Sequence, residues 1–231
     1  METLVKYYAH ISTVMPLLLK GAALTVQITA LSVFFGTIIG LGMSLMKISS
    51  NKVLKFISTV YVDFIRGTPL LVQILLIYFG IPGVIREITG ETFRMAPLMA
   101  GVIACSINSG AYVAEIFRSG IQSIDRGQME AARSLGMTKS QAMTNVILPQ
   151  AFKRVVPPMG NEFIILLKDS SLLSVIGVHE LTRQGQLYIA ATFASFPVYL
   201  AIAFVYLIMT FSISRLVSYL ERRLSISDRR D

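Results

Sequence analysis

Seven polar or charged side chains lie within or beside apolar stretches of this 231-residue sequence, and they are the residues best suited to bind a solute. They are Asp63, Arg66, Asn108, Ser109, Lys168, Asp169 and Ser170. Ionisable side chains inside a membrane are costly and are functional candidates by default. If the apolar stretches are membrane-spanning helices, a rise of about 1.5 Å per residue brings these residues near the middle of the bilayer. There they could offer a cation to one end of a solute and an anion to the other.

Structural roles compete with solute binding for several of these residues. Asp63 and Arg66 lie three residues apart and could form an ion pair on one helix face. Lys168 and Asp169 are adjacent and cannot face each other on a helix, although either could pair with another helix. Asn108 could bind a ligand or join two helices by a hydrogen bond.

Two further patterns concern local structure. Gly67-Thr68-Pro69 could kink a helix and free backbone carbonyl groups, which membrane proteins tolerate where the backbone lines a cavity. Glu115 and Arg118 are three residues apart near the end of an apolar stretch, and we expect them to form a structural ion pair.

The sequence lacks common motifs of catalysis. A phosphate-binding loop G-x-x-x-x-G-K-[ST] is absent, since the dipeptide Gly-Lys never occurs. His179-Glu180 is not followed by the second histidine of a zinc-protease helix. We therefore expect a non-enzymatic chain with no catalytic residue, metal or cofactor of its own.

Composition predicts an all-α integral membrane protein. Hydrophobic residues make up 54% of the chain and charged residues only 15%, well below the roughly 25% usual for soluble domains. A helical span needs about 20 mostly apolar residues. Five spans are predicted, at residues 21–46, 56–82, 95–114, 158–178 and 195–217. Residues 1–20 would form an interfacial or flexible segment, 21–217 the membrane domain and 218–231 a cytoplasmic tail.

The distribution of Lys and Arg predicts the orientation. Fourteen of them lie after the first span, between the third and fourth spans and in the tail, against five in the segments on the opposite side. Cytoplasmic loops carry such an excess, so the N-terminus is expected outside and the C-terminus in the cytoplasm. The net charge of +8 then reflects topology, and we expect no binding of nucleic acid.

The largest cytoplasmic loop, residues 118–156, is predicted to contain a helix–turn–helix. A first helix over 126–135 would end at Gly136, where a left-handed residue is favoured. Thr138 and Gln141 have the spacing of a capping box that opens a second helix, and Pro149 would stop or kink it. The apolar face of this insert must be buried on its own spans, in the lipid headgroups or in the groove of a partner protein.

One motif in this loop resembles the signature loop of ABC importer permeases. The pattern E-A-A-x-x-x-G, nine residues, then aliphatic-x-Leu-Pro is formed by Glu130, Ala131, Ala132, Gly136, Val146, Leu148 and Pro149. The family usually has isoleucine at the position of Val146. The stretches RGTPLLVQ, NSGAYVAEIFRSGI, EAARSLGM and GNEFIILLKDSSLLSVIG resemble the polar amino acid permeases, of the histidine, arginine and glutamine type. The resemblance covers about residues 20–220.

The resemblance implies a multi-pass subunit of a bacterial cell (inner) membrane importer. Residues 126–147 would couple it to separate cytoplasmic ABC ATPase subunits, which bind ATP and magnesium. A second permease subunit, the same or related, would complete the pathway as a dimer. A soluble amino-acid-binding protein would deliver the substrate to the outer face, near residues 82–94 and 179–194.

The substrate class and one rival remain open at this point. An unpaired Asp63 would favour a cationic side chain, whereas neutralisation by Arg66 would suit a neutral polar amino acid such as glutamine. The rival is a self-contained channel or ion-coupled carrier, whose insert packs on its own spans. An enzyme acting within the membrane is a more distant alternative.

Overall fold

The computed structural model describes the backbone of residues 1–227 and the side chains of residues 1–223. In that part of the chain every regular element is helical, which confirms the predicted fold class. Residues 228–231, the end of the predicted tail, lie outside the described residues. The α-helices are α1 (Glu2–Ile48), α2 (Lys52–Arg66), α3 (Leu70–Leu75), α4 (Ile81–Thr89), α5 (Pro97–Gln122), α6 (Arg126–Ser134), α7 (Lys139–Ala142), α8 (Leu148–Asp169), α9 (Leu181–Thr192) and α10 (Ser195–Ser227). Three turns of other helical geometry are the π-helical η1 (Leu76–Gly80) and η2 (Met143–Ile147) and the 3-10 helix η3 (Ser170–Ile176).

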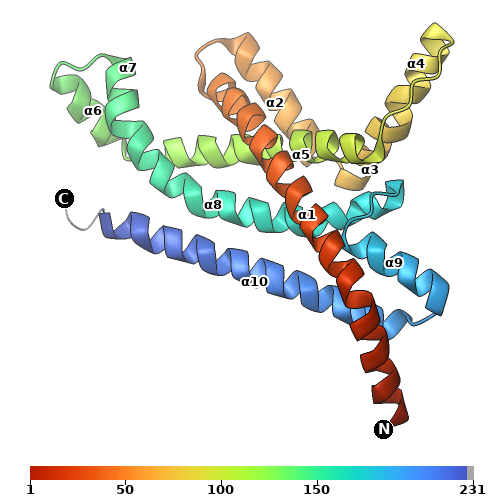
Figure 1. The fold of residues 1–231 in the computed structure, drawn as a ribbon. Coiled ribbons are helices and arrows are strands. Elements are labelled where there is room, and N and C mark those ends of the chain that lie inside the picture. Colours follow the sequence, from red (N-terminus) through yellow and green to blue (C-terminus); the bar gives the residue numbers. More distant parts are fainter. Residues whose placement is uncertain (228–231) are drawn as a thin grey trace.

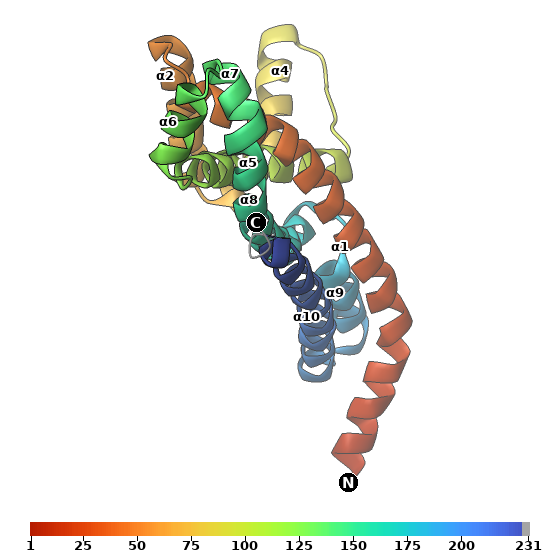
Figure 2. The same cartoon turned by 90° about the vertical axis from the view of Figure 1, so that its left-hand side faces the viewer.

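The long helices form a layer that α1 crosses. Helices α5, α8 and α10 run in similar directions across Figure 1, with α8 packed against both of the others. α1 packs against all three. Helices α6 and α7 lie at one end of this layer with the C-terminal end of α10, and α9 lies at the other. Figure 2, like Figure 1, shows α4 projecting away from the layer.

Among the described residues, four helical stretches are long and apolar enough to cross a membrane: Glu2–Ile48, Leu70–Thr89, Pro97–Gln122 and Ser195–Arg223. Three of them overlap the first, third and fifth predicted spans, and Leu70–Thr89 overlaps the second half of the second. The second predicted span is not one continuous helix, because α2 ends at Arg66 and the apolar stretch begins at Leu70. The fourth lies in α8 and η3 and is not among these stretches. The count of five spans and the side of each terminus therefore stay predictions.

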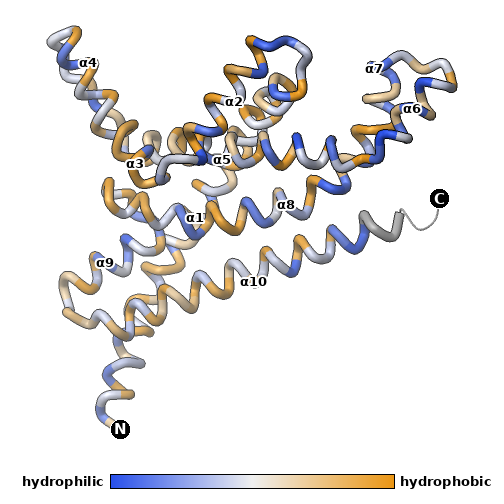
Figure 3. Tube along the Cα trace, turned by 180° about the vertical axis from the view of Figure 1, so that it is seen from behind, coloured by the Kyte–Doolittle hydropathy of each residue, from blue (hydrophilic) through white to orange (hydrophobic). Residues whose placement is uncertain are grey.

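Helix α1 is longer than the span predicted for it. It contains 47 residues and includes residues 2–20, which the sequence assigns to an interfacial or flexible segment. Figure 3 shows hydrophobic residues dominating the first half of α10, with hydrophilic residues toward its C-terminal end. Large apolar side chains such as Phe34 on α1 and Phe204 on α10 are exposed. Such surfaces suit contact with lipid.

Small residues allow α1 and α5 to approach closely. Ser32, Gly36, Gly40 and Ser44 repeat every four residues along α1, and all are buried. A Cβ atom added at Gly40 would lie 2.6 Å from Val113 on α5, closer than side-chain atoms can approach. Small-xxx-small stripes of this kind pack membrane helices through van der Waals contact. This contact fixes α5, which carries Asn108, against the longest helix of the chain.

Helices α9 and α10 meet at Glu180, whose side chain is fully buried. Its carboxylate caps α9 by accepting hydrogen bonds from the backbone N–H groups of Thr182 and Arg183, at 2.9 and 2.8 Å. It also accepts one from the Tyr206 hydroxyl of α10 at 3.1 Å. Burial raises the pKa of the Glu180 carboxyl, while the three hydrogen bonds oppose this by favouring the charged form.

Replacing Glu180 with alanine should reduce stability. The substitution removes a helix cap and leaves Tyr206 without its acceptor, so we expect a loss of about 1–2 kcal/mol. Thermal unfolding of the detergent-purified protein measures the effect. Glu91→Ala, which removes an exposed acid, is the control. Equal unfolding temperatures for the two variants would show that the buried Glu180 cap contributes nothing to the stability of the fold.

Candidate functional site

The helical structure is interrupted between α2 and α3, as the Gly67-Thr68-Pro69 pattern predicts. These three residues are not helical, and the break leaves backbone carbonyl groups without helical partners. The side chain of Gln73 satisfies two of them: its Nε2 donates to the carbonyls of Ile65 and Thr68 at 2.8 and 3.1 Å. Satisfying freed carbonyls in this way allows an irregular backbone at membrane depth.

Gln73 also connects the break to α5. Its Oε1 accepts a hydrogen bond from Nδ2 of Asn108 at 2.9 Å, and both side chains are buried. Asn108 therefore joins two helices, one of the two roles that the sequence left open. It lines a cavity as well, so the ligand-binding role stays available to it.

A cavity of about 340 Å³ lies between the broken segment, α5 and α8. Its lining residues are Thr68, Pro69, Leu70, Asn108, Tyr112, Glu162, Ile165, Leu166 and Asp169. Two of the seven candidates predicted from sequence, Asn108 and Asp169, lie here. A free amino acid or another small polar solute is the size of ligand that such a cavity accepts.

A second hollow of about 310 Å³ adjoins this cavity and shares Tyr112, Glu162 and Ile165 with it. Arg66, a third predicted candidate, lines the second hollow. Its guanidinium lies over the Tyr112 ring, 5.4 Å from the ring centroid, a cation–π arrangement. The two hollows together place one guanidinium and three carboxylates along a single groove. Glu115 is held in ion pairs with Lys47 and Arg118, whereas Glu162 and Asp169 form no ion pair within the described residues.

The two carboxylates without an ion pair come from one face of α8. Glu162 and Asp169 are seven residues apart, so they lie nearly in line along the helix. Glu162 is only 5% exposed, and it forms no ion pair with the described part of the chain. A cationic group bound in the cavity would stabilise the charged form of this carboxylate, because an unpaired buried charge is otherwise very costly.

The remaining candidates lie elsewhere. Asp63 and Lys168 are both exposed, and neither lines the cavity or the adjoining hollow. Ser109 is buried near Gly36 at the α1–α5 contact, and Ser170 donates to the Leu167 carbonyl at 2.8 Å. Of the seven candidates, Arg66, Asn108 and Asp169 thus line the cavity or its adjoining hollow, and the other four line neither.

Two ion-pair predictions can be compared with the contacts. Asp63 and Arg66 do not pair within the described residues. Glu115 and Arg118 do, at 2.7 Å, and Lys47 of α1 joins the same carboxylate group. This three-residue cluster ties the C-terminal end of α1 to α5. In the described residues, no group of three or more His, Cys, Asp or Glu side chains could hold a metal ion.

Sequence reasoning missed Glu162, Thr68 and Tyr112 as lining residues. Starting a span at Pro158 makes Glu162 look like a charge near a helix start, whereas α8 begins at Leu148 and Glu162 lies well inside it. The spacing of Glu162 and Asp169 was the available signal, since both fall on one helix face.

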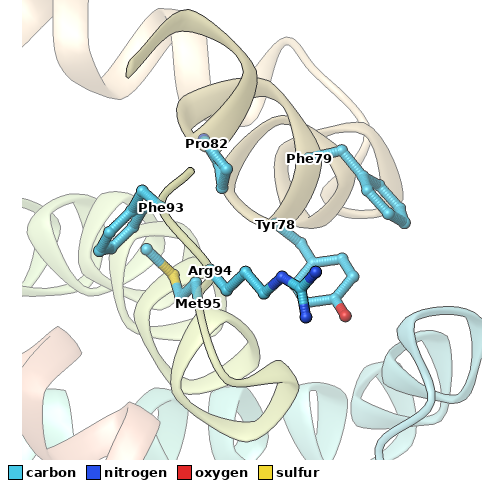
Figure 4. Close-up of a pocket in the computed structure, with 6 residues that line it drawn as sticks. All are labelled: Tyr78, Phe79, Pro82, Phe93, Arg94 and Met95. Atoms are coloured by element: carbon cyan, nitrogen blue, oxygen red, sulfur yellow. The ribbon is translucent and has the colours of Figure 1, made fainter. Parts of the chain in front are cut away.

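A separate hollow of about 410 Å³ lies between the η1–α4 region and the segment before α5 (Figure 4). It is lined by Tyr78, Phe79, Pro82, Phe93, Arg94 and Met95. Arg94 extends toward Tyr78 in Figure 4. This hollow shares no lining residue with the cavity, so a molecule bound here would contact neither Glu162 nor Asp169.

The predicted helix–turn–helix is present as α6 and α7. Gly136 adopts the left-handed conformation, with φ +87°. Both hydrogen bonds of the Thr138–Gln141 capping box form. Pro149 does not stop the helix: it lies in the first turn of α8 and follows the π-helical η2. Helix bends are common at a proline and at π-helical turns.

The insert buries much of its apolar face within the chain. Met129 of α6 and Met143, Val146 and Ile147 of η2 pack with Ile121 and Ile124 at the end of α5 and Ala151 of α8. Of the signature residues, Ala132 is also buried, while Glu130 and Ala131 are exposed. Leu135, at the tip beside Gly136, is 81% exposed. This side chain is therefore accessible to another protein surface.

Comparison with known proteins identifies the family. The binding-protein-dependent transport system inner membrane component family matches residues 32–226. The glutamine transport system permease protein GlnP of Escherichia coli (strain K12) is 41% identical over 211 residues, which are 91% of this chain and 94% of that protein. The probable glutamine ABC transporter permease protein GlnM of Bacillus subtilis (strain 168) is 43% identical over 190 residues, 82% of this chain and 85% of that protein.

Solved structures share the fold. A crystal structure of an amino acid ABC transporter with histidines matches with a TM-score of 0.84 and 47% identity, covering 96% of this chain and 97% of that one. An inward-facing structure of the MetNI methionine ABC transporter matches with a TM-score of 0.72, covering 91% of this chain and 97% of that one. Its identity of 21% shows likeness of fold alone.

Proposed function

This chain belongs to the family of binding-protein-dependent transport system inner membrane components, and we propose that it forms the substrate pathway of an ATP-driven importer for polar amino acids. The observation that carries the proposal is the groove that places Arg66, Asn108, Glu162 and Asp169 together beside a broken helix. Relatives named as glutamine permeases support the substrate class.

The groove offers complementary groups to a zwitterion. The α-ammonium binds near Glu162 and Asp169, where the buried carboxylate lacks a protein cation. The α-carboxylate points toward Arg66 in the adjoining hollow, where a guanidinium can form two parallel hydrogen bonds. Asn108 and Thr68 serve uncharged polar groups of the substrate.

A second permease subunit would complete the groove. Asp63, Arg66 and Lys168 are exposed, and none of them forms an ion pair within the described residues. Charged side chains deep in a membrane face a polar pathway or a protein neighbour rather than lipid. A dimer, of this chain or with a related one, places these charges along a shared pathway.

The α6–α7 insert couples the pathway to its energy source. This chain has no phosphate-binding loop, so ATP and magnesium bind in a separate cytoplasmic ATPase. The exposed Leu135 and Glu130 at the tip form the docking surface, and the packing of Met129 and Met143 on α5 and α8 passes movement to the pathway. On the opposite side, the segment 82–94 and the hollow in Figure 4 receive the binding protein.

One observation favours the rival reading, a self-contained channel or ion-coupled carrier. The insert packs part of its apolar face on its own chain, as that reading requires. It leaves unexplained why Leu135 stays exposed at the tip. The two hypotheses differ in one requirement: a self-contained channel or carrier would transport its solute without any ATPase.

A substrate series in proteoliposomes tests the proposed function. The complex of this chain with its copurifying ATPase and binding protein should take up glutamine or arginine only with ATP and magnesium. Glutamate should be a poor substrate, because its second carboxylate would face Glu162 and Asp169. Uptake that continues without ATP would favour the channel or carrier, and preferred uptake of glutamate would contradict the assignment of the cavity.

A further inference from the structure

A long groove that is separate from the substrate pathway runs between α1, α5 and α8. It consists of two hollows, of about 350 and 510 Å³, that both contact Ile121. Each bordering helix contributes a stripe of residues three or four apart that passes along both hollows. The stripes are Leu41, Leu45 and Ile48 on α1; Phe117 and Ile121 on α5, followed by Ile124 in the turn after it; and Met143, Ile147, Ala151 and Val155 along η2 and α8. Continuous stripes on three helices make the two hollows one groove.

The groove changes from apolar to charged along its length. The half next to Leu41 and Val155 is lined by Leu, Ile, Val, Ala and Phe side chains alone. The other half includes Gln122, Asp125, Arg126 and Lys139. An apolar half joined to a charged half has the polarity of a phospholipid, with a hydrocarbon chain and a charged headgroup.

The charged half favours an anionic headgroup. Arg126 and Lys139 are exposed, and neither forms an ion pair or side-chain hydrogen bond with the described part of the chain. Asp125 is the single acidic residue that lines this half. Its Oδ1 caps α6 by accepting a hydrogen bond from the Gly127 N–H at 2.6 Å. Two free cations therefore face one engaged carboxylate.

The apolar half is open to the surrounding membrane. Leu45 and Phe152 on its rim are more than half exposed, and its floor is closed where Gly120 lies against Val155. A hydrocarbon chain can therefore enter from the side of the helices. We infer that the groove between α1, α5 and α8 binds one anionic phospholipid, with its acyl chain along Leu41, Leu45 and Phe117 and its phosphate between Arg126 and Lys139.

Native mass spectrometry tests this inference. The full chain, purified in mild detergent with its copurifying subunits, is equilibrated with equal amounts of phosphatidylglycerol and phosphatidylcholine. Wild-type protein should retain phosphatidylglycerol in preference. The double variant Arg126→Gln/Lys139→Gln should lower the ratio of bound phosphatidylglycerol to phosphatidylcholine about tenfold or more, because each lost cation weakens attraction to the headgroup.

Two further variants locate the site. Lys52→Gln/Lys55→Gln removes two exposed cations that do not line the groove, and it should leave the lipid ratio unchanged. Leu41→Trp fills the apolar half and should reduce retention of both lipids. The inference is overturned if the Arg126/Lys139 variant keeps the wild-type ratio, if both double variants lower it equally, or if Leu41→Trp has no effect on a protein that remains folded by circular dichroism.

Discussion

Replacing Asp169 with asparagine should reduce amino acid uptake roughly 10- to 100-fold, as should Glu162→Gln. Each change keeps the size of the side chain and removes the charge that attracts the substrate ammonium. A hydrogen bond to a charged group contributes about 1.5–3 kcal/mol, which corresponds to a loss of this size. Uptake in proteoliposomes and substrate-stimulated ATP hydrolysis measure the effect.

Two other variants show whether the cavity has been assigned correctly. Glu221→Gln removes an exposed acid from α10 and should leave uptake close to wild type. Lys168→Gln should cost less than Asp169→Asn, because Lys168 does not line the cavity. If Lys168→Gln gave the larger loss of uptake, the substrate carboxylate would bind Lys168. The proposal that Glu162 and Asp169 of α8 bind the substrate would then be wrong.

Gly136→Pro should uncouple ATP hydrolysis from uptake while the protein still inserts and assembles. Gly136 has φ +87° and donates its N–H to the Arg133 carbonyl at 3.1 Å. Proline fixes φ near −65° and has no N–H, so the turn between α6 and α7 would be destabilised by about 3 kcal/mol or more. Uptake should fall to near background, as measured with the copurified ATPase present.

Gly136→Asn is the matched control for this turn. Asparagine tolerates the left-handed conformation, and open space surrounds the position where its Cβ would lie. It should therefore retain most of the coupling. Normal uptake by Gly136→Pro at normal expression would contradict the role of α6 and α7.

Local features of the fold were predictable because they depend on neighbouring residues. The left-handed Gly136 and the Thr138–Gln141 capping box follow from backbone chemistry within a few residues, and both are present. The break at Gly67-Thr68-Pro69 follows from the same kind of rule. The hydrogen bonds from Gln73 that satisfy this break were not predicted, because they depend on how α3 folds back toward it.

The direction of each side chain around its helix was harder to predict. Depth estimates placed Lys168 and Asp169 together, but adjacent residues on a helix point about 100° apart. The packing of α8 between α5 and α10 decides that Asp169 faces the cavity while Lys168 does not. Glu162 was missed for a related reason, since the true start of α8 lies in what reads as a loop.

Mild-detergent purification of the tagged chain, followed by quantitative mass spectrometry of the copurifying proteins, tests the central claim most directly. We expect a stoichiometric ABC-type ATPase that is lost from a variant in which the exposed Leu135 is replaced by aspartate. A second permease sequence in the same sample would identify a mixed dimer. Purification of a folded chain that transports amino acids without any ATPase would contradict the account.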